Sequence, residues 1–231
     1  MNLTATVGGT ASEPPGNPWL SWSYVRDNWA DITEALGQHV GLTVQAVLIG
    51  TLLALPLAML AHVRPRLAGA VLGISGALYT VPSLALFALI YPFLLDARLS
   101  VLIGLVMYAL LVLVRNVLVG LQGVPEEVRD AARGLGYRRA RLLLTVELPH
   151  ATPAMVAGLR LATVTTVALV TIGVVVGYGG LGQLMFRGFQ SSYRAEVMTA
   201  TLLCVALALA GDLLLRLVGH LATPWLRGAG R

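Results

Sequence analysis

Glycines near the end of one apolar segment have spacings that carry chemistry in other proteins. Gly177, Gly179 and Gly182 match the G-x-G-x-x-G pattern of dinucleotide-binding loops. The run from Val176 to Gly179 also resembles a potassium-channel filter. A dinucleotide loop needs a strand before it in a soluble βαβ unit, and a filter follows a short pore helix in a re-entrant loop. A full-length apolar segment precedes these glycines instead. We therefore treat both matches as coincidences and expect a flexible loop from Gly177 to Arg194.

The common catalytic signatures are absent from the sequence. It contains no H-E-x-x-H zinc site, no G-x-S-x-G nucleophile turn and no G-x-x-x-x-G-K-[ST] phosphate loop. Cys204 is the only cysteine, which excludes an intrachain disulfide and a cysteine metal cluster. No pair of carboxylates lies at a catalytic depth within the apolar segments. We expect a chain that is not an enzyme, holds no metal or cofactor and cannot hydrolyse ATP by itself.

The composition is that of an integral membrane protein. Of the 231 residues, 57% are hydrophobic and only 12% are charged, and the mean hydropathy is +0.79. Soluble globular chains carry about a quarter charged residues. A water-exposed surface cannot be built from so few charges.

Five apolar segments are long enough to cross a bilayer, which takes about 20 residues. They are residues 40–63, 68–95, 99–121, 153–176 and 197–218. Strand-like alternation over segments of about ten residues does not recur. The sequence therefore predicts an all-α, polytopic transmembrane helical bundle with about five spanning helices.

The arginines predict the orientation of this bundle, because short cytoplasmic loops are enriched in them. Nine arginines lie in segments that alternate to share one side: Arg64, Arg66, Arg129, Arg133, Arg138, Arg139, Arg141, Arg227 and Arg231. The opposite side has four: Arg26, Arg98, Arg187 and Arg194. We expect a multi-pass protein of the cell (inner) membrane with the N-terminus outside and the C-terminus in the cytoplasm. This asymmetry explains the formal charge of +5 without nucleic acid as a partner.

The flanks of the bundle have their own patterns. Residues 1–17 are rich in small and polar types and are expected to be a flexible tail without a cleavable signal peptide. Residues 18–38 form an expected amphipathic helix, and residues 221–231 a cytoplasmic tail. The apolar stripe of that helix comprises Trp22, Val25, Trp29, Ile32 and Leu36. Tryptophans on such a helix suit the outer membrane interface, and the alternative is that the stripe packs against the protein's own spans.

An interrupted span and several aromatic rings suggest a passage through the bundle. Pro82 removes a backbone hydrogen bond and predicts a kink, where Thr80 and Ser83 could satisfy freed carbonyls or line a path. Aromatic rings attract quaternary ammonium groups, at about 0.5–2 kcal/mol each. The rings in question belong to Tyr79, Phe87, Tyr91 and Tyr108. The candidate path residues are Tyr79, Thr80, Pro82, Ser83 and Tyr108. The alternatives are a purely structural kink and rings that pack against neighbouring helices.

Other ionisable groups near the spans have simpler interpretations. Asp212 and Arg216 are four residues apart on one helix face and are expected to pair with each other. Arg115 and Arg160 lie toward the inner side, where their side chains can reach the headgroups. His62 is expected at the membrane interface.

The most patterned segment is the loop 122–152. Pro125 followed by Glu126 and Glu127 is a helix start, since proline suits the first turn and carboxylates complement the helix dipole. Gly134 and Gly136 are natural helix stops. A second helix is expected from residue 138 to 145. The loop is thus predicted to be a helix, a turn and a second helix on the cytoplasmic face.

This loop resembles the signature of importer permeases of the ATP-binding-cassette type, which reads Glu-Ala-Ala, three residues, Gly, nine residues, Ile, one residue, Leu-Pro. The matching positions are Asp130, Ala131, Ala132, Gly136, Val146, Leu148 and Pro149. Asp130 and Val146 are conservative departures from that pattern. In the family this loop forms a coupling helix that sits in a groove of the ATPase subunit and passes its closure to the spans. The resemblance implies that Asp130, Ala131, Ala132 and Gly136 carry the docking.

The resemblance covers residues 39–220, a type I permease domain, and is strongest to permeases for osmoprotectants such as glycine betaine, choline, carnitine and proline betaine. The segments that suggest this are residues 79–86, 108–110, 114–116 and 177–182. Permeases for methionine or ergothioneine share much of this frame. An amino acid or an ergothioneine-like compound is therefore the alternative substrate.

The resemblance also implies partners. They are a second permease subunit, identical or related, two cytoplasmic ATP-binding subunits, an extracytoplasmic substrate-binding protein and the lipid bilayer. The loop from Gly177 to Arg194 is a candidate contact for the binding protein. A secondary transporter or channel that works alone would account for the spans and the kink but not for the patterned loop. A passive assembly subunit is a further alternative.

Overall fold

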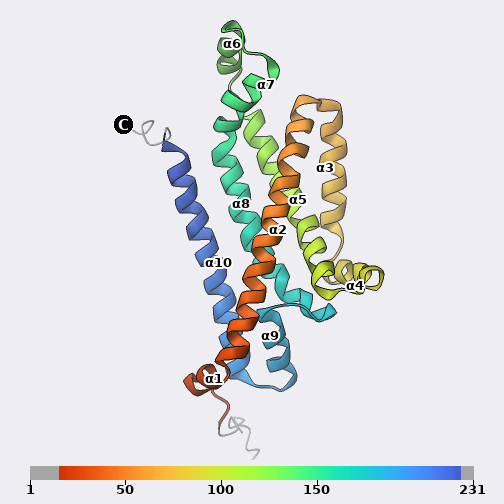
Figure 1. Cartoon of the computed structure of the whole chain (residues 1–231), viewed down its shortest axis with the longest axis vertical. Coiled ribbons are helices and arrows are strands. Elements are labelled where there is room, and N and C mark those ends of the chain that lie inside the picture. The colour runs from red at the N-terminus through yellow and green to blue at the C-terminus, as the bar shows by residue number, and fades with distance from the viewer. Residues whose placement is uncertain (1–15, 225–231) are drawn as a thin grey trace, which may run out of the picture.

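The computed structural model describes residues 16–224, and every regular element in this range is a helix (Figure 1). The expected tails, 1–17 and 221–231, therefore lie largely outside the described residues. The elements are α1 (Trp22–Asp27), α2 (Trp29–Val63), α3 (Pro65–Thr80), α4 (Ser83–Leu94), α5 (Ala97–Gln122), α6 (Glu126–Gly134), α7 (Arg139–Leu142), η1 (Leu143–Glu147), α8 (Leu148–Val170), η2 (Thr171–Val176), α9 (Leu181–Gln190) and α10 (Arg194–Ala222).

The expected amphipathic helix 18–38 is divided at Asn28. The short α1 is capped by the Ser21 side chain, which accepts a hydrogen bond from the Tyr24 amide, and the first span begins already at Trp29 as part of α2. The 35 residues of α2 extend about 52 Å at 1.5 Å per residue, which is more than the roughly 30 Å of a bilayer core. The predicted stripe is split as well. Trp22 and Trp29 are 78% and 61% exposed, whereas Ile32 packs against α9 and α10.

The second predicted span, 68–95, is not one continuous helix. α3 ends at Thr80, and α4 starts at Ser83 in a direction that differs by 94°. Val81 adopts an extended conformation between them, as expected of a residue before proline. The predicted kink at Pro82 is therefore a sharp bend, and α4 lies at the side of the bundle, turned away from the direction of the spans (Figure 1). Within the described residues, four helical segments could each span a membrane, and the bent pair would be the fifth.

The remaining spans agree with the sequence pattern. α5 and α10 contain the predicted segments 99–121 and 197–218. The fourth span is longer than predicted, because α7, η1, α8 and η2 form one helical run of 38 residues from Arg139 to Val176. Pro149 follows directly after the π-helical segment η1, in the first turn of α8, and Pro153 lies one turn later inside the same helix.

α5 is the central helix of the bundle and packs against α2, α3, α4 and α8. Close packing requires small residues on it. A Cβ added at Gly104 would collide with the ring of Phe87, which is completely buried under α5. α10 contacts α8 and α9 but leaves a long apolar face exposed, which suits a lipid environment.

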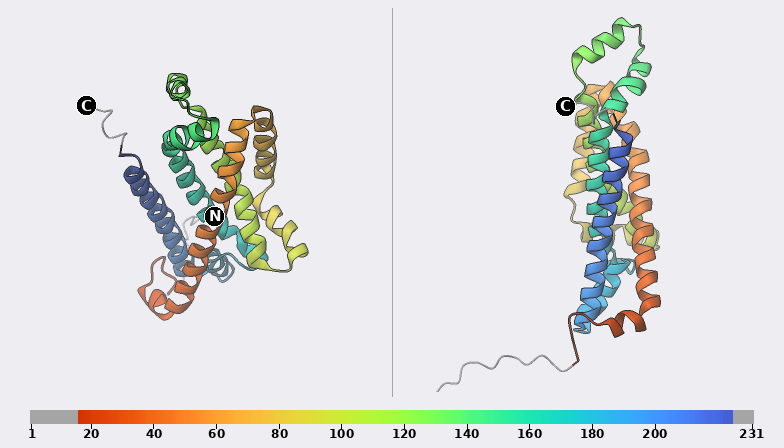
Figure 2. Two further views of the ribbon diagram at one scale, coloured as in Figure 1. Left: turned by 45° about the horizontal axis from the view of Figure 1, so that its top comes forward. Right: turned by 90° about the vertical axis from the view of Figure 1, so that its left-hand side faces the viewer.

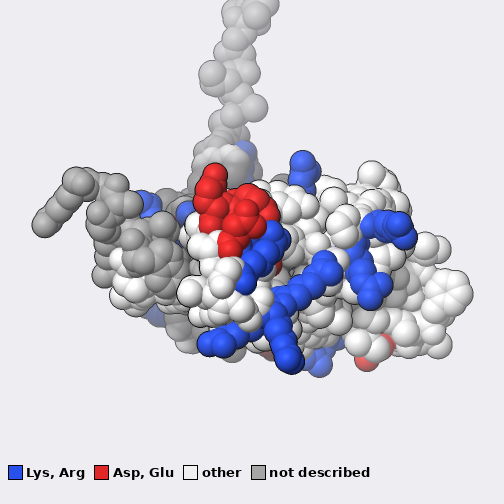
Figure 3. Space-filling view, turned by 90° about the horizontal axis from the view of Figure 1, so that it is seen from above, with Lys and Arg blue, Asp and Glu red and all other residues white. Residues whose placement is uncertain are grey.

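The two ends of the bundle differ in their charges. We name them the α6 end and the α9 end. The α2–α3 junction, the α6–α7 hairpin and the end of α10 share the α6 end (Figure 1). α6 and α7 project beyond the spans there (Figure 2), and acidic groups lie next to arginines on this surface (Figure 3). The three arginine-rich segments thus share one end, as predicted, although Arg227 and Arg231 lie outside the described residues.

Candidate functional site

α6 begins and ends where the sequence predicts, whereas the second helix, expected at 138–145, starts at Arg139 and continues into the fourth span. Pro125 precedes α6, and Glu126 and Glu127 occupy its first turn. α6 ends in a Schellman motif: the Gly136 amide donates to the Arg133 carbonyl and the Tyr137 amide to the Ala132 carbonyl. Gly136 has a φ of +82°, which is the left-handed conformation that glycine adopts at little cost.

Most of the signature residues on the hairpin are exposed, and one of them is buried beneath the others. Asp130, Ala131 and Gly136 are exposed on the hairpin, and the Ala132 side chain is buried beneath them. Leu148 is half-buried, and Pro149 is exposed at the start of α8. Val128 and Leu135 add apolar side chains to the exposed surface of α6. The hairpin therefore offers backbone and small side chains to a partner beyond the bundle.

Ion pairs stiffen α6. Arg133 pairs with Glu126 and with Asp130, at 2.8 Å in both cases, and Arg129 pairs with Glu126 at 3.1 Å. Hydrogen bonds from Arg133 and Arg129 hold the pKa of the Glu126 carboxyl below its ordinary value. The same contacts to Glu126 and Asp130 raise the pKa of the Arg133 guanidinium. Asp130, a predicted docking residue, is thus held in place by Arg133.

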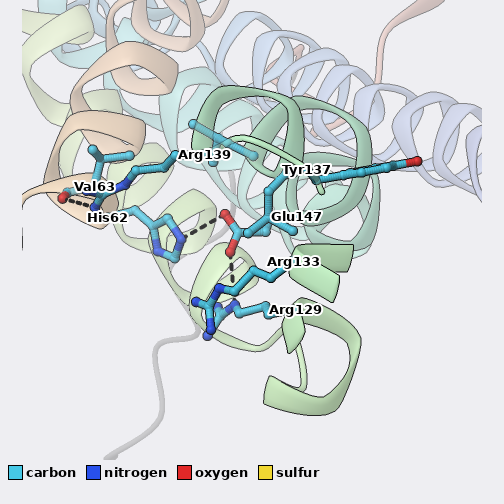
Figure 4. A pocket seen from close by; sticks show the side chains of 9 residues that line it. His62, Val63, Arg129, Arg133, Tyr137, Arg139 and Glu147 are labelled. Atoms are coloured by element: carbon cyan, nitrogen blue, oxygen red, sulfur yellow. Dashed lines mark hydrogen bonds and ion pairs between the residues drawn. The ribbon is translucent and has the colours of Figure 1, made fainter. Parts of the chain in front are cut away.

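A buried carboxylate at the base of the hairpin was not predicted from the sequence. Glu147, in η1, is 6% exposed. It accepts hydrogen bonds from Arg129 and from His62, at the end of α2 (Figure 4). A cavity of about 440 Å³ lies beside these groups and is also lined by Arg133 and Arg139. The sequence does contain one indication of this site. Glu147 lies next to an apolar span, and an acidic side chain in such a position needs a partner.

The candidate path residues converge at the bend between α3 and α4. Tyr79, Thr80, Pro82, Ser83 and Tyr108 all line one open pocket of about 380 Å³, together with Val81, Thr165, Ala168 and Leu169. The Tyr79 and Tyr108 rings meet edge to face with centroids 5.7 Å apart. Among the residues that the structure describes, none with a charged side chain lines this pocket. It can offer ring faces and hydroxyls to a small solute.

The polar groups at this bend also have structural partners. The Thr80 hydroxyl donates to the Ala77 carbonyl at 2.7 Å, as expected at a helix end. The Tyr108 hydroxyl donates to the Val81 carbonyl. Of the other proposed rings, Phe87 is buried in the core and cannot contact a solute, and Tyr91 lies partly exposed on α4.

The predicted flexible loop from Gly177 to Arg194 contains a helix, α9, which packs against α2 and α10. Four of its glycines, Gly179, Gly180, Gly182 and Gly188, serve close packing. A Cβ at Gly180 would lie 2.8 Å from the Cβ of His39, which is buried in α2. His39 Nδ1 accepts from the Leu181 amide at 3.3 Å, and Nε2 donates to the Val167 carbonyl at 3.0 Å. This segment is therefore an ordered part of the bundle, and the expectation of a flexible loop was wrong.

The expected pairing of Asp212 with Arg216 is not the ion pair that forms. Asp212 accepts two hydrogen bonds from Arg160 of α8, both at 2.8 Å. This bidentate pair joins α10 to α8, so Arg160 does not simply reach toward the headgroups. In the part of the chain that the structure describes, no group of histidine, cysteine and acidic side chains has the geometry of a metal site.

Comparison with known proteins assigns this architecture to a family. The model of the family described as "Binding-protein-dependent transport system inner membrane component" matches residues 46–228. The carnitine transport permease protein OpuCB of Listeria monocytogenes is 34% identical over 176 residues, which cover 76% of this chain and 80% of that protein. The osmoprotectant import permease protein OsmW of Salmonella typhimurium is 34% identical over 206 residues, which cover 87% of this chain and 96% of that protein.

A solved structure has the same fold. A chain of the MetNI methionine ABC transporter in an inward-facing conformation superposes with a TM-score of 0.77 at 23% identity, over 88% of this chain and 100% of that chain. The predicted all-α type I permease fold and the predicted importer family are thus confirmed. The chain belongs to the inner membrane components of binding-protein-dependent transport systems, as a multi-pass permease subunit of an ABC importer.

Proposed function

We propose that α6 is the coupling helix of this permease and docks in a groove of a separate ATPase subunit. The observation that carries the proposal is the exposed edge of the hairpin, formed by Asp130, Ala131 and Gly136. The hairpin itself projects beyond the spans (Figure 2). Ala131 lets a partner approach the α6 backbone closely. Arg133 orients the Asp130 carboxylate from 2.8 Å away, so little side-chain freedom is lost when a partner binds.

The proposed orientation of the protein in the membrane rests on the arginines of the α6 end. The arginine-rich α6 end faces the cytoplasm in this proposal, because short cytoplasmic loops are enriched in arginine. The α9 end then faces outward, with the N-terminus outside and the C-terminus inside. A second permease subunit, two ATP-binding subunits and an external binding protein, with α9 among its contacts, complete the importer.

The transported solute is a small osmoprotectant of the quaternary amine or betaine class. Support comes from relatives named for carnitine, choline and osmoprotectant transport. The pocket at the α3–α4 bend, with Tyr79 and Tyr108, is the proposed part of the path. Its rings can attract a quaternary ammonium by cation–π contact. Its lack of charged side chains suits a permease, since a solute bound weakly can leave again.

In the proposed cycle, ATP closes the two ATPase subunits and α6 moves with them. The spans then change from inward-open to outward-open and receive the solute from the binding protein. Hydrolysis of ATP returns them to the inward-open state. The chain itself carries out no chemical step.

The docking is tested by a cysteine crosslink from position 131 to the ATPase in the assembled importer, with Cys204 replaced by serine. We expect a crosslink at 131 and none at Leu95, which is exposed but lies at the bend between α4 and α5. Absence of the crosslink at 131 in an intact complex would refute docking through α6.

The solute class is tested by uptake into liposomes that contain the complete importer. Labelled choline, carnitine and glycine betaine are compared with methionine and ergothioneine. Uptake confined to the last two would support the alternative substrates, and uptake without ATP would identify a transporter that works alone.

A further inference from the structure

Glu147 is a buried acid whose two oxygens have different partners. Its side chain is 8% exposed, and Oε1 accepts from Arg129 Nε at 2.9 Å while Oε2 accepts from His62 Nε2 at 3.1 Å. An ionised carboxylate is costly to bury unless it is paired and hydrogen-bonded. Glu147 therefore needs both neighbours, and they come from different helices: His62 from α2 and Arg129 from α6.

Arg129 extends this network to one further element, α5, and also binds within α6. Its Nη2 donates to the Leu121 carbonyl at the end of α5 at 2.8 Å, and its Nη1 donates to Glu126 in α6. Two side chains, Arg129 and Glu147, thus connect α2, α5, α6 and η1. Figure 4 shows the Glu147 carboxylate between its two partners, His62 and Arg129. We call Glu147, Arg129 and His62 the hairpin node.

The hairpin node lies at the junction between the α6–α7 hairpin and the spanning helices. Glu147 is the last residue of η1, a π-helical segment inside the helical run from Arg139 to Val176. Such segments are rare and are frequent at functional sites. One turn beyond, α8 touches α5 closely, because a Cβ at Gly120 would lie 2.9 Å from the Ala151 carbonyl. A rotation about Glu147 would therefore displace α8 and α5 together.

We propose that Glu147 is the positioning residue through which a movement of α6 reaches the ends of α2, α5 and α8. The proposal rests on the coupling role of α6 given above. Arg129 transmits the displacement of α6 to the carboxylate, and His62 passes it on to α2. A glutamate suits this position, because both oxygens accept hydrogen bonds. A glutamine side chain would keep only one acceptor oxygen and would lose the negative charge that pairs with Arg129.

The test compares Glu147→Gln with a matched control in the importer assembled with its ATPase and binding protein. Glu127→Gln makes the same chemical change on the same hairpin, at an exposed side chain. For Glu147→Gln we expect continued ATP hydrolysis and a roughly ten-fold drop in solute moved per ATP, on the scale of coupling free energies between sites. Glu127→Gln should keep the wild-type ratio. A wild-type ratio in assembled Glu147→Gln would overturn the proposal, since a merely structural role would lower only the amount of complex.

A distance measurement gives a second readout. Spin labels at Leu60 in α2 and Glu127 in α6, both exposed and outside the docking residues, should keep one narrow distance distribution with and without ATP in the protein with Cys204 replaced by serine. Glu147→Gln should broaden that distribution when ATP binds, and an unchanged distribution would overturn the proposal. If Glu147→Gln does not assemble, His62→Ala carries the same test, because it removes only the α2 contact.

Failure here is distinguishable from failure of the coupling role. If α6 does not dock, the crosslink from position 131 to the ATPase is absent already in the wild type. If α6 docks but Glu147 does not transmit its movement, the crosslink forms and Glu147→Gln transports normally.

Discussion

The Tyr108 hydroxyl donates a hydrogen bond to the Val81 carbonyl and so ties α5 to the bend between α3 and α4. This carbonyl belongs to the residue at which α3 has stopped, so the helix itself offers it no donor. Within a membrane protein, such a backbone group must be satisfied by a side chain, by water or by neighbouring protein. The ring that faces the proposed path therefore also holds the shape of the path.

Tyr108→Phe separates these two roles, because it keeps the ring and removes the hydroxyl. We expect a loss of about 0.5–1.5 kcal/mol in the free energy of unfolding, the usual net value of one hydrogen bond, together with reduced uptake. Thermal unfolding in detergent and uptake in liposomes check this. Tyr91→Phe on α4 removes a hydroxyl outside the pocket and should change neither. Wild-type values for Tyr108→Phe would contradict a role for the hydroxyl.

Gly136→Val tests the turn that ends α6. A β-branched side chain at a φ of +82° costs about 1–2 kcal/mol and should displace the hairpin edge. We expect uptake to be abolished while membrane insertion stays normal, as measured by transport and by membrane fractionation. Gly134→Ala is the control, because its added Cβ meets no atom within 4 Å. Normal uptake by Gly136→Val would count against docking through this turn.

Gly104→Ala tests the packing of α4 on α5. The new methyl group would overlap the buried Phe87 ring, and overpacking of this kind costs about 1–3 kcal/mol. The apparent melting temperature should therefore fall, as followed by thermal unfolding. Gly73→Ala in α3, where an added Cβ meets no atom within 4 Å, should leave it unchanged. An equal shift for both variants would show that the contact does not matter.

The Glu126 carboxylate gives the hairpin a defined pH response. Its pKa is lowered in the folded hairpin, because Arg133 and Arg129 donate hydrogen bonds to the ionised form. The stabilisation is therefore complete above the ordinary pKa of glutamate and is lost as the pH falls through the lowered value. A spin label at position 131, with Cys204 replaced by serine, should become more mobile over that acidic range. In Glu126→Gln the label should be mobile at every pH, and a wild-type response in that variant would exclude Glu126 as the cause.

Local signals predicted the positions of most helices. α5 and α10 follow from uninterrupted apolar runs, and α6 follows from Pro125, its two acidic neighbours and Gly136. These features act within one or two turns of the chain. Because these features are local, the helices could be predicted without knowing which segments contact one another in the fold.

The features that the sequence did not reveal depend on contacts between distant residues. Glycines from 177 to 182 look like a flexible loop, but Gly180 is required because His39 lies against its backbone. Asp212 has Arg216 four residues away on its own helix and nevertheless pairs with Arg160 of α8. Glu147 is 85 residues from His62 in the chain, so no local pattern joins them. The docking and path residues stay predictions.

The sharp bend after Thr80 has a consequence for solvation. With its 16 residues, α3 is about 24 Å long, which is less than the roughly 30 Å thickness of the hydrocarbon layer. The chain therefore turns sideways before it has crossed, and peptide groups that a straight helix would shield must find water or hydroxyls at that depth. On the proposed path, a solute at this level would meet those same groups in place of part of its hydration shell.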